Sequence, residues 1–155
     1  MSPRIILDTQ LIVLLAVGVT SADIIPKHKN LTEFTCEDFE LLLLLLGPDP
    51  DLLLLPNTVS EAANLLRHHR EPERGRIMEK FREIVGRNPE RYIHSRLVTQ
   101  QPEYLRLGVT DAAILGIFSP GEEILTADAA LYIAAMRRGL SATNFHHKRE
   151  EFGIV

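Results

Sequence analysis

The chain has 155 residues, of which 45% are hydrophobic and 25% charged, and these values are typical of one globular domain spanning residues 1–155. Its formal net charge of -4 argues against a generally basic nucleic-acid-binding protein. The single cysteine, Cys36, excludes an intrachain disulfide framework and a cysteine-rich zinc site. Such cysteine usage favours a reducing compartment, and we expect the protein to be cytoplasmic.

Hydrophobic periodicity predicts strands that alternate with helices along the chain. In chain order we expect a strand at 5–7, a helix at 9–17, a polar connection at 20–34, a helix at 36–46 capped by Thr35, a strand at 52–55, helices at 59–70 and 72–85, a helix at 111–118, a strand at 123–126, a helix at 129–138 and a strand at 142–145. Residues 92–95 could form a short strand or part of another helix. The alternation predicts a three-layer α/β/α sandwich around a central, mainly parallel sheet.

Two apolar stretches resemble targeting or membrane segments and need a separate interpretation. Residues 11–19 follow a basic residue as in a signal peptide, yet Asp8 and Gln10 interrupt the apolar run, which favours a folded strand and helix. The leucine-rich residues 41–55 contain Gly-Pro-Asp-Pro-Asp, so they fall short of the ~20 consecutive apolar residues that span a bilayer. We expect no membrane segment.

Four acidic residues lie where apolar runs give way to helical patterns. Asp8, Glu61, Asp111 and Asp128 stand in the contexts RIILDTQ, LPNTVSEAA, GVTDAAI and ILTADAA. In an open parallel sheet, side chains at the carboxyl ends of the strands gather in one crevice, so these acids can converge. Converging carboxylates repel one another, and a divalent cation removes that repulsion.

Each of these acids also has a purely structural interpretation. Asp8, Asp111 and Asp128 could be helix N-caps, each accepting a backbone N–H and contributing ~1 kcal/mol. Thr58 and Glu61 have the spacing of a capping box, in which the glutamate reaches back to the N–H of the cap residue. Taken singly, each acid fits a cap. Taken together with their flanking patterns, the four fit a metal site.

The motifs around the acids resemble those of the PIN-domain nucleases, and the resemblance covers nearly the whole chain. The matching motifs are LDT at 7–9, TVSE at 58–61, TDAAI at 110–114 and LTAD at 125–128, followed by a closing strand like residues 142–145. Gln10 stands where the family usually has asparagine, and no further acid closely follows Asp128.

The resemblance implies a metal-dependent endoribonuclease that hydrolyses RNA phosphodiester bonds with Mg²⁺ or Mn²⁺ as its cofactor. All four acids would be catalytic under this interpretation. Asp8, Asp111 and Asp128 would be metal ligands, and Glu61 would complete the cluster directly or through water.

Two threonines and a basic segment complete the expected site. Thr9 and Thr126 would orient a carboxylate or a phosphate. Residues 67–106 carry ten Lys or Arg against six Asp or Glu, whereas both flanks are acidic, so this segment is the expected RNA-facing surface. The RNA-binding candidates are Arg74, Arg76, Lys80 and Arg82. Ile77 and Phe81 share one helical face of the segment, and that face could instead dock a second copy of the chain or an antitoxin.

A compact single PIN domain of this size is similar to the toxins of VapBC-type toxin–antitoxin pairs, which implies a homodimer silenced by a small antitoxin protein. Two alternatives stay open. An aspartyl phosphohydrolase also has an Asp after its first strand, but it needs a second acid where this chain has Gln10. A catalytically weak PIN domain could serve as an RNA-binding or assembly module, although all four acids are present.

Overall fold

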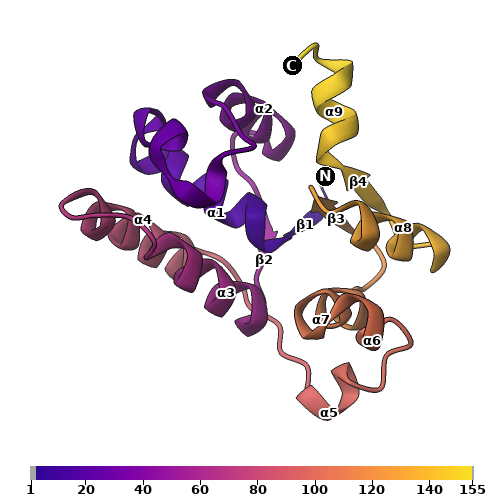
Figure 1. Cartoon of the computed structure of the whole chain (residues 1–155). Coiled ribbons are helices and arrows are strands. Elements are labelled where there is room, and N and C mark those ends of the chain that lie inside the picture. The colour runs from indigo at the N-terminus through magenta and orange to yellow at the C-terminus, as the bar shows by residue number, and fades with distance from the viewer. Residues whose placement is uncertain (1–2, 155) are drawn as a thin grey trace.

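A parallel sheet lies at the centre of the computed structural model, which describes residues 3–154. The strands of the described part are β1 (Arg4–Leu7), β2 (Leu52–Leu53), β3 (Glu122–Thr126) and β4 (Ala142–Asn144). They lie in the order β2-β1-β3-β4 (Figure 1). In this arrangement Ile6 of β1 is opposite Leu53 on one side and Ile124 on the other. The first strand of the sequence therefore has a central position in the sheet.

Helices connect the strands and cover both faces of the sheet (Figure 1). They are α1 (Thr9–Thr20), η1 (Ala22–Lys27), η2 (Lys29–Leu31), α2 (Cys36–Leu46), α3 (Pro56–Leu66), α4 (Glu73–Arg87), α5 (Ser95–Val98), α6 (Tyr104–Leu107), α7 (Val109–Ile117), α8 (Ala129–Arg137) and α9 (Phe145–Glu151). The helices α3 and α4 pack on α1 at one face, whereas α5 and α6 pack on α7 at the other. Between residues 3 and 154, no helix has the length and apolar character needed to cross a membrane.

Alternate residues of each strand point to opposite faces of the sheet, as the two-residue period of a strand requires. Ile5 and Leu7 belong to an apolar core that α1, α2, α3 and α4 complete, while Ile6 belongs to a second core with α7 and α8. All three side chains are at most 8% exposed. Two cores separated by one parallel sheet confirm the expected three-layer α/β/α fold.

The connection after α1 contains two short helices that were not predicted. Residues 22–27 and 29–31 form the two 3₁₀ helices η1 and η2. These helices place Ile24, Ile25 and Leu31 in the core beside α1. The prediction of a polar connection missed this contribution to the core, because a few apolar residues without helical or strand periodicity still supply surface that the neighbouring helices bury.

Several helix starts differ from the sequence prediction, and α7 begins at Val109 rather than at residue 111. The helix α3 begins at Pro56 rather than at Val59, since proline suits the first turn, where its missing N–H would have no partner in the helix. The helix α9 follows β4 where no helix was predicted, and the Asn144 side chain accepts the His146 N–H at its start. Residues 92–94 form neither the short strand nor the helix that was considered for residues 92–95, and α5 begins only at Ser95.

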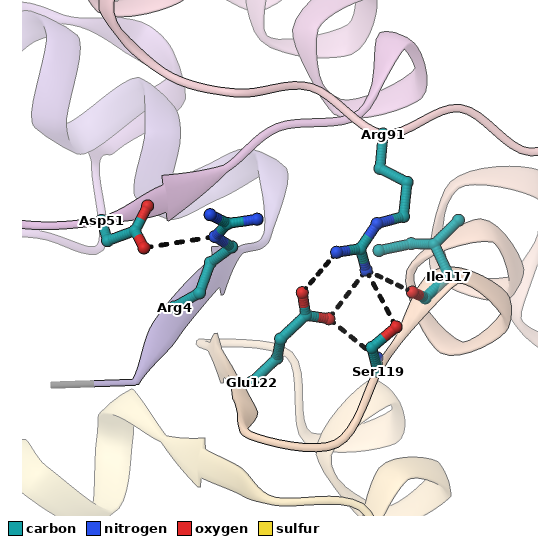
Figure 2. Close-up of polar contacts among 6 residues, drawn as sticks. All are labelled: Arg4, Asp51, Arg91, Ile117, Ser119 and Glu122. Atoms are coloured by element: carbon teal, nitrogen blue, oxygen red, sulfur yellow. Dashed lines mark hydrogen bonds and ion pairs between the residues drawn. The ribbon is translucent and has the colours of Figure 1, made fainter. Parts of the chain in front are cut away.

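An ion pair between Arg91 and Glu122 lies at the amino-terminal end of the sheet (Figure 2). Arg91, after α4, donates to both carboxylate oxygens of Glu122 at 2.9 and 2.6 Å, and to the carbonyl oxygen of Ile117 at 2.7 Å. Burial raises the pKa of Glu122, but the hydrogen bonds from Arg91 and from the Ser119 N–H outweigh it and hold the pKa below its ordinary value. The pair ties the segment after α4 to the start of β3.

The apolar face of α4 packs inside the chain. Ile77 is fully buried and Phe81 is 6% exposed, and both belong to the core that α1 shares. The prediction that this face could dock a second copy or an antitoxin was wrong, because α4 folds back along α3 and lies against α1. The sequence shows that a helix has an apolar face but not which surface covers it.

Candidate active site

The four acids singled out in the sequence line one pocket at the carboxyl ends of β1 and β3. Asp8 follows β1 and Asp128 follows β3, while Glu61 comes from α3 and Asp111 from α7. The cavity has a volume of about 430 Å³. The packing of α3 and α7 beside the sheet therefore brings together carboxylates from four separate segments.

Asp8 is the buried member of the cluster. Its Oδ1 accepts the Leu11 N–H at 3.0 Å and so caps α1, while its Oδ2 accepts the Ala127 N–H at 2.8 Å and the Thr126 hydroxyl. Burial raises the pKa of Asp8 above its ordinary value, and the hydrogen bonds from Thr126, Leu11 and Ala127 oppose that rise. Asp8 thus serves as a helix cap and also joins the ends of β1 and β3.

Asp128 also caps a helix, but only one of its carboxylate oxygens does so. Its Oδ1 accepts the N–H groups of Ala130 and Leu131 at 2.8 and 3.1 Å. Its own N–H donates to the Thr126 hydroxyl oxygen at 2.9 Å. Thr126, which we expected to orient a carboxylate, thus donates to Asp8 and accepts from Asp128.

Asp111 has no capping role. The helix α7 begins at Val109 with Gly108 at its N-cap, so Asp111 lies inside the first turn and the N-cap interpretation was wrong for it. Gly108 has a φ of 91°, which glycine adopts without strain as the chain turns from α6 into α7. Burial first, and then the charges of the other three acids, raise the pKa of Asp111 to about 7. The carboxyl therefore lies within electrostatic reach of the rest of the cluster.

Glu61 has no capping role either. Because α3 begins at Pro56, Glu61 lies in the middle of the helix, and the hydroxyl of Thr58 donates to a backbone carbonyl instead of forming a capping box. The Oε1 atom of Glu61 accepts the Thr9 hydroxyl at 3.0 Å, and Oε2 accepts the Thr110 hydroxyl at 2.5 Å. Glu61 is therefore turned toward α1 and α7, where the pocket lies.

Sequence reasoning did not assign a role to three other polar residues that line the pocket, namely Gln10, Glu33 and Thr110. Glu33 follows η2, and the strand-end rule could not find it because no strand precedes it. Thr110 had a usable signal, since it stands directly before Asp111 in the motif that carries the family resemblance.

The four cations expected to bind RNA lie on α4, and none of them lines the acidic pocket. Three of them pair with glutamates three residues away, which are Arg74 with Glu71, Lys80 with Glu83 and Arg82 with Glu79. Such exposed pairs contribute little to stability and leave the cations accessible. The fourth, Arg76, lines a shallow hollow together with Lys80.

The donors of the pocket suit a hard divalent cation by their chemistry. Carboxylate oxygens are the ligands that Mg²⁺ and Mn²⁺ prefer, and the cap at α8 leaves Oδ2 of Asp128 unused. Within residues 3–154, however, no three His, Cys, Asp or Glu side chains already form a metal-binding group. Glu61 and Asp128 are exposed, so rotation of these two side chains can tighten the cluster.

A comparison of the chain with models of known protein families found no match. A comparison with curated proteins found no match either. The case for a function therefore depends on the motifs and on the geometry of the acidic pocket.

Proposed function

We propose that the chain is an endoribonuclease that hydrolyses RNA phosphodiester bonds with the help of Mg²⁺ or Mn²⁺. The observation that carries this proposal is the meeting of Asp8, Glu61, Asp111 and Asp128 in one pocket. Two of the four, Glu61 and Asp111, cap no helix, so capping does not explain their presence there. Acids that raise the pKa of a neighbouring carboxyl are typical of functional sites.

Asp8, Asp111 and Asp128 are the proposed ligands of the cation, and Glu61 completes the cluster directly or through a water molecule. When bound, such a cation supplies a water of lowered pKa and positive charge beside the phosphodiester. Asp8 provides a fixed point, because three hydrogen-bond donors hold its carboxylate. Burial and then the charges of the other acids raise the pKa of Asp111, and a cation bound among the acids would remove the part due to repulsion.

On the basis of the family resemblance, the proposal also includes protein partners. A VapBC-type toxin would form a homodimer and would be silenced by a small antitoxin protein. The exposed cations of α4 would face the RNA while the acids hold the reacting phosphate. A catalytically weak PIN domain that binds RNA or assembles with a partner is the alternative, and the cleavage experiment below separates the two.

The wild-type protein is expected to cleave RNA in Mg²⁺ or Mn²⁺, to lose cleavage in excess EDTA, and to regain it when either ion is restored. The reason is that a cation held by the carboxylates would lower the pKa of the attacking water, and among the described residues no histidine, lysine or cysteine lines the pocket. The measurement is cleavage of a labelled RNA, with release of phosphate from a small phosphomonoester as the control. Full cleavage in EDTA would contradict the mechanism, RNA binding without cleavage would favour the alternative, and phosphomonoester hydrolysis would indicate a phosphohydrolase.

Changing Arg74, Arg76, Lys80 and Arg82 together to alanine is expected to weaken RNA binding and to flatten its salt dependence, by up to about one unit of log–log slope per lost phosphate contact. Mn²⁺ affinity should stay the same, because none of the four lines the acidic pocket. The measurement is RNA affinity at several salt concentrations. A slope equal to that of the wild type would show that α4 does not contact phosphates.

A further inference from the structure

Glu61 differs from Asp8 and Asp128 in that side-chain donors alone hold its carboxylate. Asp8 and Asp128 are fixed by backbone N–H groups at helix starts, whereas both oxygens of Glu61 accept threonine hydroxyls. Thr9 opens α1 directly after Asp8, and Thr110 directly precedes Asp111 in α7. The two hydroxyls therefore connect Glu61 to the segments that carry two of the other acids.

The position of Glu61 needs such support for two physical reasons. A glutamate has a long side chain with several rotatable bonds, and Glu61 lies on an exposed part of α3, so solvent offers it many alternative rotamers. Its charge also acts on Asp111, whose pKa it helps to raise, and this like-charge repulsion favours rotamers that point away from the pocket. Hydroxyl donors on both oxygens oppose this tendency, because hydrogen bonds to a charged acceptor are among the stronger ones.

We propose that Thr110 is a positioning residue that holds the Glu61 carboxylate in the acidic cluster, with Thr9 as its counterpart on the other oxygen. This inference rests on the proposed function, because it assigns Thr110 a part in assembling the site for the cation. Thr110 is suited to the part by its place at the start of α7, where a short side chain with one rotatable bond reaches Glu61 Oε2 at 2.5 Å. The position requires a hydrogen-bond donor to the Glu61 carboxylate, and the volume of the side chain matters less.

Two substitutions separate the hydroxyl from the shape of the side chain. Thr110→Val keeps the shape and removes the donor, while Thr110→Ser keeps the donor. Thr143→Val is a matched control, because Thr143 donates to Glu123 at 2.7 Å in another threonine–glutamate pair that lies outside the acidic pocket. The measurements are Mn²⁺ affinity by electron paramagnetic resonance, the rate of RNA cleavage, and metal-free thermal stability.

Thr110→Val is expected to weaken Mn²⁺ binding by about tenfold and to slow cleavage by about 10- to 100-fold, the usual effect of losing a group that orients a ligand. Thr110→Ser should stay close to the wild type in both, and Thr143→Val should change neither. Wild-type Mn²⁺ affinity and cleavage in Thr110→Val would overturn the positioning role, even if its stability fell.

The outcomes also distinguish this inference from the proposed function. A wild-type protein that binds Mn²⁺ but cuts no RNA would reject the nuclease, while weaker Mn²⁺ binding by Thr110→Val with recovery in Thr110→Ser would still support the positioning role. If the wild type cuts RNA and Thr110→Val binds Mn²⁺ and cuts RNA equally well, the positioning role alone would be rejected.

Discussion

Replacing Asp111 by asparagine is expected to lower RNA cleavage by about a thousandfold, because several kcal/mol of transition-state stabilisation depend on a charged ligand. The same change should raise the free energy of unfolding at pH 8 by about 1–2 kcal/mol, after allowance for screening by solvent. Asp111 caps no helix, so asparagine loses no capping hydrogen bond there. Cleavage rates and chemical denaturation on the same samples check both results.

The pH dependence of this gain has a defined sign. The pKa of Asp111 rises from 3.8 to about 7 in the folded protein, so between these values the folded state binds the proton and the unfolded state does not. Stability from this residue therefore falls as the pH rises through that window, and the cost is fully present above it. The stability difference between Asp111→Asn and the wild type should grow from pH 4 to pH 7 and then level off. A difference that is constant across this range would contradict the assignment.

Comparing Asp8→Asn with Asp111→Asn separates the loss of a charged ligand from the loss of a structural hydrogen bond. Cleavage should fall here too, since Asp8 is another proposed ligand, but stability should fall as well. An asparagine can still accept the Leu11 N–H, yet its amide NH₂ would face the Ala127 N–H that Oδ2 of Asp8 accepts. A donor without an acceptor in a buried position costs about 1–3 kcal/mol. Equal stability changes at positions 8 and 111 would mean that their environments do not differ in this way.

Replacing Arg149 by methionine is expected to lower the free energy of unfolding by about 3–5 kcal/mol. Arg149 Nε lies 2.6 Å from Oδ1 of Asp38, whose side chain is fully buried. The other oxygen of Asp38 accepts the Thr35 N–H at 2.8 Å within the capping box of α2. Among the described residues, Oδ1 has no partner besides the ion pair with Arg149, so the substitution would leave it buried and unpaired. Chemical denaturation measures the loss.

Two controls define the interpretation of that loss. Arg82→Met removes an exposed cation paired with Glu79 and should change stability by less than about 0.5 kcal/mol. Adding Asp38→Asn to Arg149→Met should recover part of the loss, since an asparagine oxygen can still accept the Thr35 N–H and carries no charge. If Arg149→Met costs no more than Arg82→Met, the pair between α9 and α2 does not support the fold.

The limits of sequence reasoning are clearest at the helix starts. The start of α2 was predicted because Thr35 and Asp38 form a capping box from local contacts alone. The start of α3 was not, because the TVSE segment offered a plausible cap while Pro56 in fact opens the helix. Because α3 begins three residues earlier than predicted, Glu61 lies in the middle of the helix and is not a cap residue. Its carboxylate accepts hydroxyl hydrogen bonds from α1 and α7.

The sequence by itself determined the alternation of strands and helices, the three-layer fold and the four acids, because strand period, helix period and strand-end placement are local patterns. Only the tertiary structure decided what each acid does. Asp8 and Asp128 cap helices while Asp111 and Glu61 do not, and the pKa of Asp111 near 7 depends on burial and on charges from distant segments. Such effects arise from packing in space, and neighbours in the sequence do not encode them.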